Sequence, residues 1–242
     1  MAADRQYLSA SAGNTVPNIA GARALAACCA VLVVLLQLIA GATQAREFRP
    51  GEFDYYVLAL SWSPTYCASD AAASDRQQCA PGRRYAFVVH GLWPQFKQGW
   101  PESCETRETW VPEEQVKAML DIMPSPNLVI HEWKKHGSCS GLTIAEYFAK
   151  IRALFTMIRI PARYLAPNDD LVATPKEITD DFMKTNPGIS AEMMALECGN
   201  RSDRARLSEL RVCFDRDGAL SACGGNEKRQ CRAKILVMPR VR

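Results

Sequence analysis

The number and placement of its cysteines most constrain how this chain can fold. Ten cysteines occur in 242 residues, and eight of them follow the apolar stretch at residues 24–40. An even number of cysteines in an exported chain indicates disulfide bonds and an oxidising compartment. Eight cysteines allow 105 different pairings, so the residues by themselves leave the connectivity open. Because no Cys-x-x-Cys pair occurs, a zinc ribbon or a redox dithiol is not expected.

The N-terminal segment has the pattern of a secretory signal peptide. A polar stretch precedes the apolar run at 24–40, and the small residues at 41–45 precede Arg46. We therefore expect a signal peptide over residues 1–45, with a long polar region at its start, and a secreted or periplasmic protein. After cleavage, no stable association with a membrane is expected. The alternative is an uncleaved membrane anchor, because the 17 residues of the apolar run approach a spanning length.

Residues 46–242 are long enough for a single domain with a sizeable hydrophobic core. Hydrophobic residues make up 48% of the chain and charged residues 23%, which is ordinary for a globular protein. The formal net charge is only +3, so the overall charge does not indicate a nucleic-acid-binding protein. Recognition of a polyanion would depend on where individual charges are placed. No repeat or linker separates a second domain.

Apolar strands are predicted near both ends of this domain, with amphipathic helices between them. The predicted strands cover 53–64, 84–94, a hairpin over 207–223 that turns at Asp217-Gly218, and 233–239. The predicted helices cover 112–122, 131–137, 143–159, 174–184 and 190–197, and three of them begin at Thr143, Thr174 and Ser190. This order favours an α+β fold, with helices packed around a central antiparallel sheet.

Only three histidines occur, and they lie in two unusual strings. FVVHGLWPQ (87–95) holds His90 where the predicted strand ends, and HEWKKHGSC (131–139) holds the other two. If the second string is helical, residues advance by about 100° each, and four polar side chains share one arc of about 140°: His131, Lys135, Glu132 and His136. This arc suits a site for a dianionic transition state. The alternative is a surface helix with ion pairs three and four residues apart.

Two imidazoles from separate strings match the needs of phosphoryl transfer. One imidazole can remove a proton from an attacking hydroxyl while the other protonates the leaving oxygen. Both titrate near neutral pH, and each role contributes roughly 10²–10⁴-fold to the rate. A nearby lysine and a third histidine would offset the charge that grows on the phosphoryl oxygens. When the nucleophile is the 2′-hydroxyl of RNA itself, neither a metal nor an enzyme nucleophile is required.

The two strings resemble the active-site segments of the ribonuclease T2 family. They occur in the family's order, about 40 residues apart, in a cysteine-rich chain with an export signal. A looser similarity extends from Tyr55 to Pro239. The resemblance implies a metal-independent endoribonuclease without a cofactor. Such an enzyme cleaves single-stranded RNA, and not DNA, into 2′,3′-cyclic phosphate and 5′-hydroxyl ends, and we expect it to be a monomer.

The resemblance also implies roles for individual residues. His90 and His136 would form the acid–base pair, with His136 favoured as the base toward the 2′-hydroxyl and His90 as the acid to the 5′-oxygen. His131 would bind the substrate phosphate. Glu132 and Lys135 would stabilise the pentacoordinate phosphorane.

Base binding is implied for Trp93 and Gln95. Trp93 would stack on a base, although a tryptophan of the core is the structural alternative. Many relatives carry an acidic or amide residue after the Trp-Pro pair, and the neutral amide of Gln95 leaves the base preference open. The basic residues around 201–211 and 228–234 could follow phosphates, but a solvated face is the simpler interpretation.

Four disulfides are implied by the resemblance: Cys67–Cys79, Cys104–Cys139, Cys198–Cys231 and Cys213–Cys223. The bond from Cys104 to Cys139 would hold the histidine helix against the loop that follows His90. Cys213 and Cys223 also flank the predicted Asp217-Gly218 turn.

Two other classes of protein remain as alternatives. A zinc metalloprotease would use histidines four residues apart on one helix face, whereas His131 and His136 are five apart and no further histidine follows them as a third ligand. A chelator would stop zinc hydrolysis but not histidine catalysis. A secreted binding or storage protein that keeps the fold would be expected to lose a histidine, and an RNA cleavage assay distinguishes it.

Overall fold

The computed structural model describes residues 48–199, 204–227 and 231–241. All of them belong to one compact unit, Glu47–Arg242. The expected signal peptide over 1–45 lies outside the described residues. Within the described ranges, no helix combines the length and the hydrophobicity needed to cross a membrane.

The six described strands form one sheet in the order β2-β1-β5-β6-β3, and β4 pairs with β5. Their bounds are β1 Tyr55–Trp62, β2 Phe87–Gln95, β3 Leu171–Ala173, β4 Met194–Gly199, β5 Arg204–Phe214 and β6 Ile235–Met238. The expected α+β fold is confirmed, but the sheet is mixed. Four strand pairs are antiparallel, whereas β5 and β6 are parallel because the chain re-enters the sheet beside the start of β5 and runs in the same direction.

Four helices overlap the ranges that the sequence predicts. They are α4 Glu113–Lys117, α5 Pro126–Lys135, α6 Ile144–Met157 and α7 Pro175–Thr185, and two short helices, α2 Ser63–Cys67 and α3 Arg76–Cys79, follow β1. One of the four, α5, begins before its predicted start at residue 131. Both predicted capping boxes are present, from Thr143 to Glu146 and from Thr174 to Glu177. Helix α4 is shorter than expected, because the chain after Lys117 continues as turns.

Two sequence predictions near β5 need correction. The helix expected over 190–197 is wrong: Ala191–Met193 form one 3-10 turn, and Met194–Gly199 form β4. Backbone pairing with β5 satisfies that apolar segment better than a helix does. The Asp217-Gly218 turn is present, with Gly218 at φ 100°, but its return segment makes only the bridge from Phe214 to Leu220 in the described chain.

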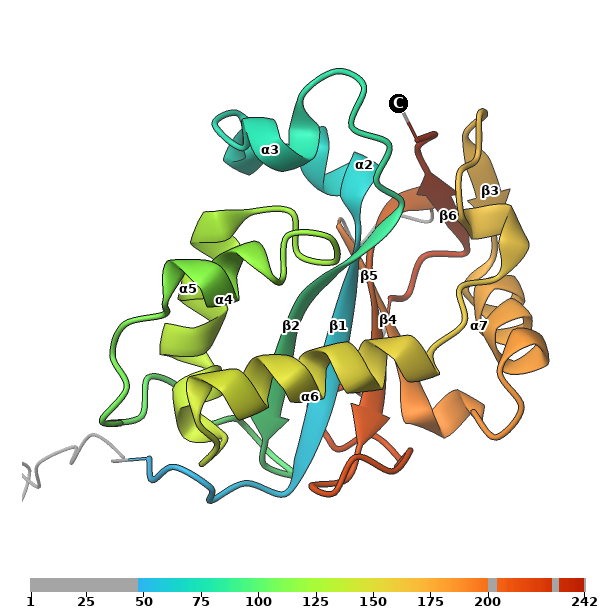
Figure 1. Cartoon of the computed structure of the whole chain (residues 1–242). Helices are drawn as coiled ribbons and strands as arrows, with labels where there is room; N and C mark the ends of the chain where they lie inside the picture. Colours follow the sequence, from blue (N-terminus) through green and yellow to red (C-terminus); the bar gives the residue numbers. More distant parts are fainter. Residues whose placement is uncertain (1–47, 200–203, 228–230, 242) are drawn as a thin grey trace, which may run out of the picture. The chain divides into compact units, whose positions relative to one another are not determined.

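Alternate residues of β1 face two different environments. Tyr56, Leu58, Leu60 and Trp62 belong to the main core, which α5, α6 and α7 cover. Figure 1 shows α6 crossing the sheet, and it contacts both β1 and β2. Tyr55 and Val57 point to the opposite side, where they pack with Cys213 against Trp93. This second side of the sheet carries the polar residues described below.

The structure contains the four disulfides that the resemblance implies. They join Cys67 to Cys79, Cys104 to Cys139, Cys198 to Cys231 and Cys213 to Cys223. The bond between Cys213 and Cys223 closes the turn after β5. The bond between Cys198 and Cys231 ties β4 to the segment that leads into β6. The bonds Cys104–Cys139 and Cys198–Cys231 join segments that are 35 and 33 residues apart in the sequence.

Candidate active site

The sequence predicts His90 at the end of a strand, but in the structure it lies inside β2. Strand β2 pairs with β1 through Ala59 and Gly91 on one side of it and through Leu60 and Val89 on the other. His90 is therefore the extra residue of a β-bulge. A bulge bends its strand and redirects a side chain, and such bulges are frequent beside active sites. The bulge explains how a residue inside a sheet keeps a side chain that is 35% exposed.

The second histidine string ends helix α5. The helix stops at Lys135, and His136 forms its C-terminal cap, with its backbone N–H donating to the Glu132 carbonyl. Gly137 then starts a 3-10 turn in which a side chain would collide with Trp133, since an added Cβ would lie 2.5 Å from that ring. Position 137 therefore requires glycine, because the backbone there passes against the Trp133 ring. This close packing also fixes the position of the preceding residue, His136.

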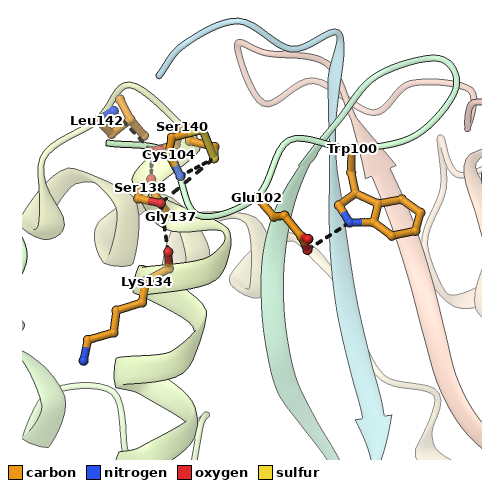
Figure 2. The surroundings of a disulfide bond; sticks show 9 residues. Trp100, Glu102, Cys104, Lys134, Gly137, Ser138, Ser140 and Leu142 are labelled. Atoms are coloured by element: carbon orange, nitrogen blue, oxygen red, sulfur yellow. Dashed lines mark hydrogen bonds between the residues drawn. A yellow bond between two sulfur atoms is a disulfide. The ribbon is translucent and has the colours of Figure 1, made fainter. Parts of the chain in front are cut away.

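A disulfide and several hydrogen bonds hold this end of α5, as Figure 2 shows. Cys139 is bonded to Cys104, and the backbone N–H of Ser103 donates to the Lys135 carbonyl at 2.8 Å. The Ser138 hydroxyl donates back to the carbonyl of Lys134 at 3.0 Å. The loop that follows β2 is therefore attached to the residues on both sides of His136.

Trp93 connects the two histidine strings. Its ring centroid lies 5.2 Å from that of His90 and 5.4 Å from that of His136. Its indole N–H donates to Glu132 Oε2 at 2.8 Å, and Glu132 Oε1 lies 3.7 Å from His90 Nε2. The strand and the end of the helix therefore lie together, with both imidazoles against the same indole.

Glu132 is almost completely buried, with 1% of its surface exposed. Burial raises its pKa to about 7, although His90 and the indole N–H of Trp93 act in the opposite direction. Its carboxylate lies directly over the backbone of Gly91: a Cβ there would be 1.8 Å from Glu132 Oε2. Glycine at position 91 is thus a condition for placing this carboxylate in the site.

The two imidazoles have opposite electrostatic surroundings. Burial and the positive charge of Lys135 lower the pKa of His136 to about 3. Burial also disfavours the charged form of His90, but its hydrogen bond with Glu209 and the charges of Glu209 and Glu132 outweigh that effect and raise the pKa of His90. At neutral pH His136 is therefore neutral, whereas His90 keeps its proton to a higher pH than an ordinary imidazole does.

The remaining residues of the predicted arc face outward. His131 is exposed, and burial together with the nearby Lys135 lowers its pKa. Lys135 is 41% exposed, and its Nζ lies 3.7 Å from Glu102. Lys134 is exposed and Trp133 is buried in the core, in agreement with their positions outside the arc.

Gln95 is buried. It is 4% exposed, and its side-chain oxygen accepts a hydrogen bond from Asn226 at 2.8 Å. In this arrangement the amide oxygen holds the loop around Asn226, and base binding by Gln95 stays a prediction. Trp93 is half-buried and keeps part of its surface accessible beside His90.

Two residues that sequence reasoning left out complete the site. Glu209 on β5 lies with its Oε1 2.6 Å from His90 Nδ1. Arg211, two residues further along, binds Glu209 and places its guanidinium 5.0 Å above the Trp93 ring. Arg211 belongs to the cluster that was interpreted as a solvated face, and for this residue that interpretation is wrong. Residues 201–203 and 228–230 of the two basic clusters lie outside the described chain.

One signal could have identified this pair. Glu209 and Arg211 are two apart in a predicted strand, so their side chains share a face.

In the described part of the chain, no group of three or more His, Cys, Asp or Glu side chains is arranged to hold a metal ion.

Most of this chain is similar to known ribonucleases. A model of the ribonuclease T2 family matches residues 53–223. A ribonuclease of Aeromonas hydrophila is 48% identical over 117 residues, which cover 46% of this chain and 51% of that relative. A probable ribonuclease of Haemophilus influenzae is 32% identical over 182 residues, covering 70% and 61%. The chain thus spans about half to three fifths of the length of these two curated relatives.

The fold agrees with this assignment. A ribonuclease-related protein from Calystegia sepium superposes with a TM-score of 0.61, at 20% sequence identity, over 79% of this chain and 99% of that protein. The match to the family model includes His90, Glu132, His136 and Glu209. The chain belongs to the ribonuclease T2 family.

Proposed function

We propose that this protein is a metal-independent endoribonuclease that cleaves single-stranded RNA by transesterification. The observation that carries the proposal is the placement of His90 and His136 against one indole, with pKa values moved in opposite directions. One imidazole is thereby prepared to accept a proton and the other to donate one. Membership of the ribonuclease T2 family supports RNA as the substrate.

In the proposed reaction, His136 acts as the base and His90 as the acid. His136 takes the proton of the 2′-hydroxyl, whose oxygen forms a bond to the adjacent phosphorus. The bond from phosphorus to the 5′-oxygen breaks, and His90 gives its proton to that oxygen. Because Nδ1 of His136 is buried without a hydrogen-bond partner among the described residues, Nε2 is the nitrogen that would exchange this proton. The products are a 2′,3′-cyclic phosphate and a 5′-hydroxyl.

Three residues of α5 would act on the phosphoryl oxygens. His131 and Lys135 are accessible and would bind the negative charge. Glu132, whose pKa is raised to about 7, is largely protonated in mildly acidic solution. A neutral carboxyl avoids repulsion of the dianionic phosphorane, and it can donate a hydrogen bond to it.

Base recognition is proposed for Trp93 but not for Gln95. Stacking of a base on an aromatic ring contributes about 1–3 kcal/mol and tolerates different bases. Gln95 is buried and bonded to Asn226, so we assign it to the support of the neighbouring loop. The base preference would then depend on residues around Trp93.

The test uses single-stranded RNA and DNA of the same sequence, incubated with the purified chain in excess EDTA. We expect cleavage of the RNA and an intact DNA strand, because the reaction requires a 2′-hydroxyl and no metal. Activity that stops with EDTA would contradict the proposal in favour of a metal-dependent hydrolase. Binding of RNA without cleavage would instead favour a non-catalytic binding protein.

The rate of cleavage is expected to be highest in mildly acidic solution. His136, with a pKa of about 3, is available as a base above that pH. His90 is protonated only below its raised pKa, and Glu132 only below about 7, so both contributions are lost as the pH rises. Measurement of kcat between pH 3 and 9 should therefore show a decrease above about 7. A rate that increases steadily toward pH 9 would contradict these assignments.

Replacement of His131 by alanine should raise KM more than it lowers kcat. The residue is exposed beside the site, and a charged hydrogen bond to phosphate contributes about 1.5–3 kcal/mol, or about tenfold and more in binding. Because the pKa of His131 is lowered, the effect should grow as the pH falls. Steady-state kinetics on a dinucleotide substrate would measure it, and an unchanged KM in acidic solution would exclude the phosphate-binding role.

We also propose that the protein is a secreted or periplasmic monomer, with residues 1–45 removed. The four disulfides support an oxidising compartment. Mass spectrometry of the mature N-terminus would test the cleavage, and detection of an intact leader would favour the membrane-anchor alternative.

A further inference from the structure

We propose that Glu209, held in place by Arg211, is the positioning residue of His90: it fixes the ring so that Nε2 faces the substrate. This inference rests on the proposed function for its catalytic consequence. The contact itself is a property of the folded chain, and it can be measured without RNA.

The contact spans three strands. His90 comes from β2 and Glu209 from β5, and β1 lies between these two strands. On this side of the sheet β1 presents only small residues at the crossing: Ala59, which pairs with Gly91 and Arg211, and Ser61, which pairs with Glu209. Strands separated by one neighbour are about 10 Å apart. The bulge at His90 and the small residues of β1 together let the two side chains meet.

Both oxygens of Glu209 are occupied. Oε1 lies 2.6 Å from His90 Nδ1, while Oε2 accepts from Arg211 Nε at 3.0 Å and from Arg211 Nη2 at 2.9 Å. Arg211 also donates to Glu197 at 3.2 Å. A carboxylate that is bonded at both oxygens, with 11% of its side chain exposed, has one orientation available. Glu209 is therefore a rigid partner for the imidazole.

The hydrogen bond determines which nitrogen of His90 can react. A carboxylate at Nδ1 requires a proton on Nδ1, so the proton that a charged His90 gives to the leaving oxygen is the one on Nε2. The charged and titratable groups around His90 are Glu209 and Arg211 from β5, together with Glu132, His131 and His136 from the α5 region. Of these, Glu209 is the one within hydrogen-bond distance of the ring.

A purely structural ion-pair network would have a different signature. Glu209, Arg211 and Glu197 could simply stabilise the pairing of β4 and β5. Loss of that function would lower the melting temperature without changing the titration of His90. The two roles are separable, because the chain contains only three histidines and each ring can be assigned by nuclear magnetic resonance.

The experiment compares the full chain, Glu209→Gln and Glu197→Gln by ¹⁵N resonance of the histidine rings and by the pH dependence of kcat. Glutamine keeps the size of Glu209 and removes its charge, and we expect the His90 titration to move down by about one pH unit, a tenfold change. The decrease of kcat with pH should shift in parallel, with little change in KM. Glu197→Gln, which touches Arg211 but not His90, should leave the His90 titration in place.

An unchanged His90 titration in Glu209→Gln would overturn the inference. If that variant does not fold, the unmodified chain tests the inference instead. At a pH above the titration midpoint of His90, the neutral ring should carry its proton on Nδ1. A proton on Nε2 would contradict the inference. A chain that shows the expected tautomer and shift but cleaves no RNA would overturn the proposed function and leave the His90–Glu209 coupling established.

Discussion

Alanine in place of His90 or His136 is expected to lower kcat for RNA cleavage by roughly 10²–10⁴-fold, the contribution of one acid or base group. The two positions are not equivalent in pH dependence. Without His90, the decrease of the rate above neutral pH should weaken, because the group that must stay protonated is gone. Steady-state assays on a dinucleotide between pH 4 and 8, on the order of one point per half unit, would measure both effects.

His131→Ala is the matched control, since it removes an imidazole from the same region but should act on KM. His90→Ala and His136→Ala should keep the circular dichroism spectrum of the native chain, because His90 is partly exposed and the buried His136 is not one of the hydrophobic core residues. If His136→Ala retained more than about a tenth of the activity while folded, the acid–base pair would have to be reassigned.

Gly91→Ala should abolish most of the activity although it adds one methyl group. The new Cβ would lie 1.8 Å from Glu132 Oε2 and 2.6 Å from the indole nitrogen of Trp93. Real atoms do not approach so closely, so the carboxylate and the indole must move apart and their 2.8 Å hydrogen bond is lost. Displacement of a site by about 1 Å can cost about 10²-fold. The measurement is kcat on a dinucleotide, with the melting temperature recorded alongside.

Gly199→Ala is the appropriate control, because a Cβ there meets nothing within 4 Å. It should leave both activity and stability nearly unchanged. A Gly91→Ala protein with full activity would show that the position of Glu132 beneath the site is not needed for turnover.

Much of this site could be predicted from the sequence because it lies within two short strings. Periodicity places His131, Glu132, Lys135 and His136 on one arc of a helix. In the structure the first three lie on α5, and His136 is its C-terminal cap. The apolar strings around Tyr55 and His90 predict buried strands, and they are β1 and β2.

The rest depends on strand register, which a local pattern does not contain. That His90 occupies a bulge follows only from how β1 and β2 pair. The meeting of His90 with Glu209 requires β5 to lie next but one to β2, with Ala59 and Ser61 at the crossing. For the same reason, the sequence pattern wrongly predicts a helix over 190–197: residues 194–199 form β4 because they pair with β5, and not because of their own propensity.

Burial explains why the side chain of Gln95 does not face the surface beside Trp93, where a base-binding residue would lie. The family resemblance implies base contact for the amide beside the Trp-Pro pair. In the fold its side chain is turned toward Asn226, more than a hundred residues away in the chain. A local motif identifies which residues are close to a site, but it does not show which of them face the substrate.

The identity of the cleavage products tests the central claim most directly. An RNA oligonucleotide would be digested in EDTA for a short time, and the fragment ends determined by mass spectrometry. Two imidazoles acting on the 2′-hydroxyl and the 5′-oxygen predict a 2′,3′-cyclic phosphate on the upstream fragment and a 5′-hydroxyl on the downstream one. Fragments that carry a 5′-phosphate and a 3′-hydroxyl would show that water or another nucleophile attacks, and would contradict the two-histidine account.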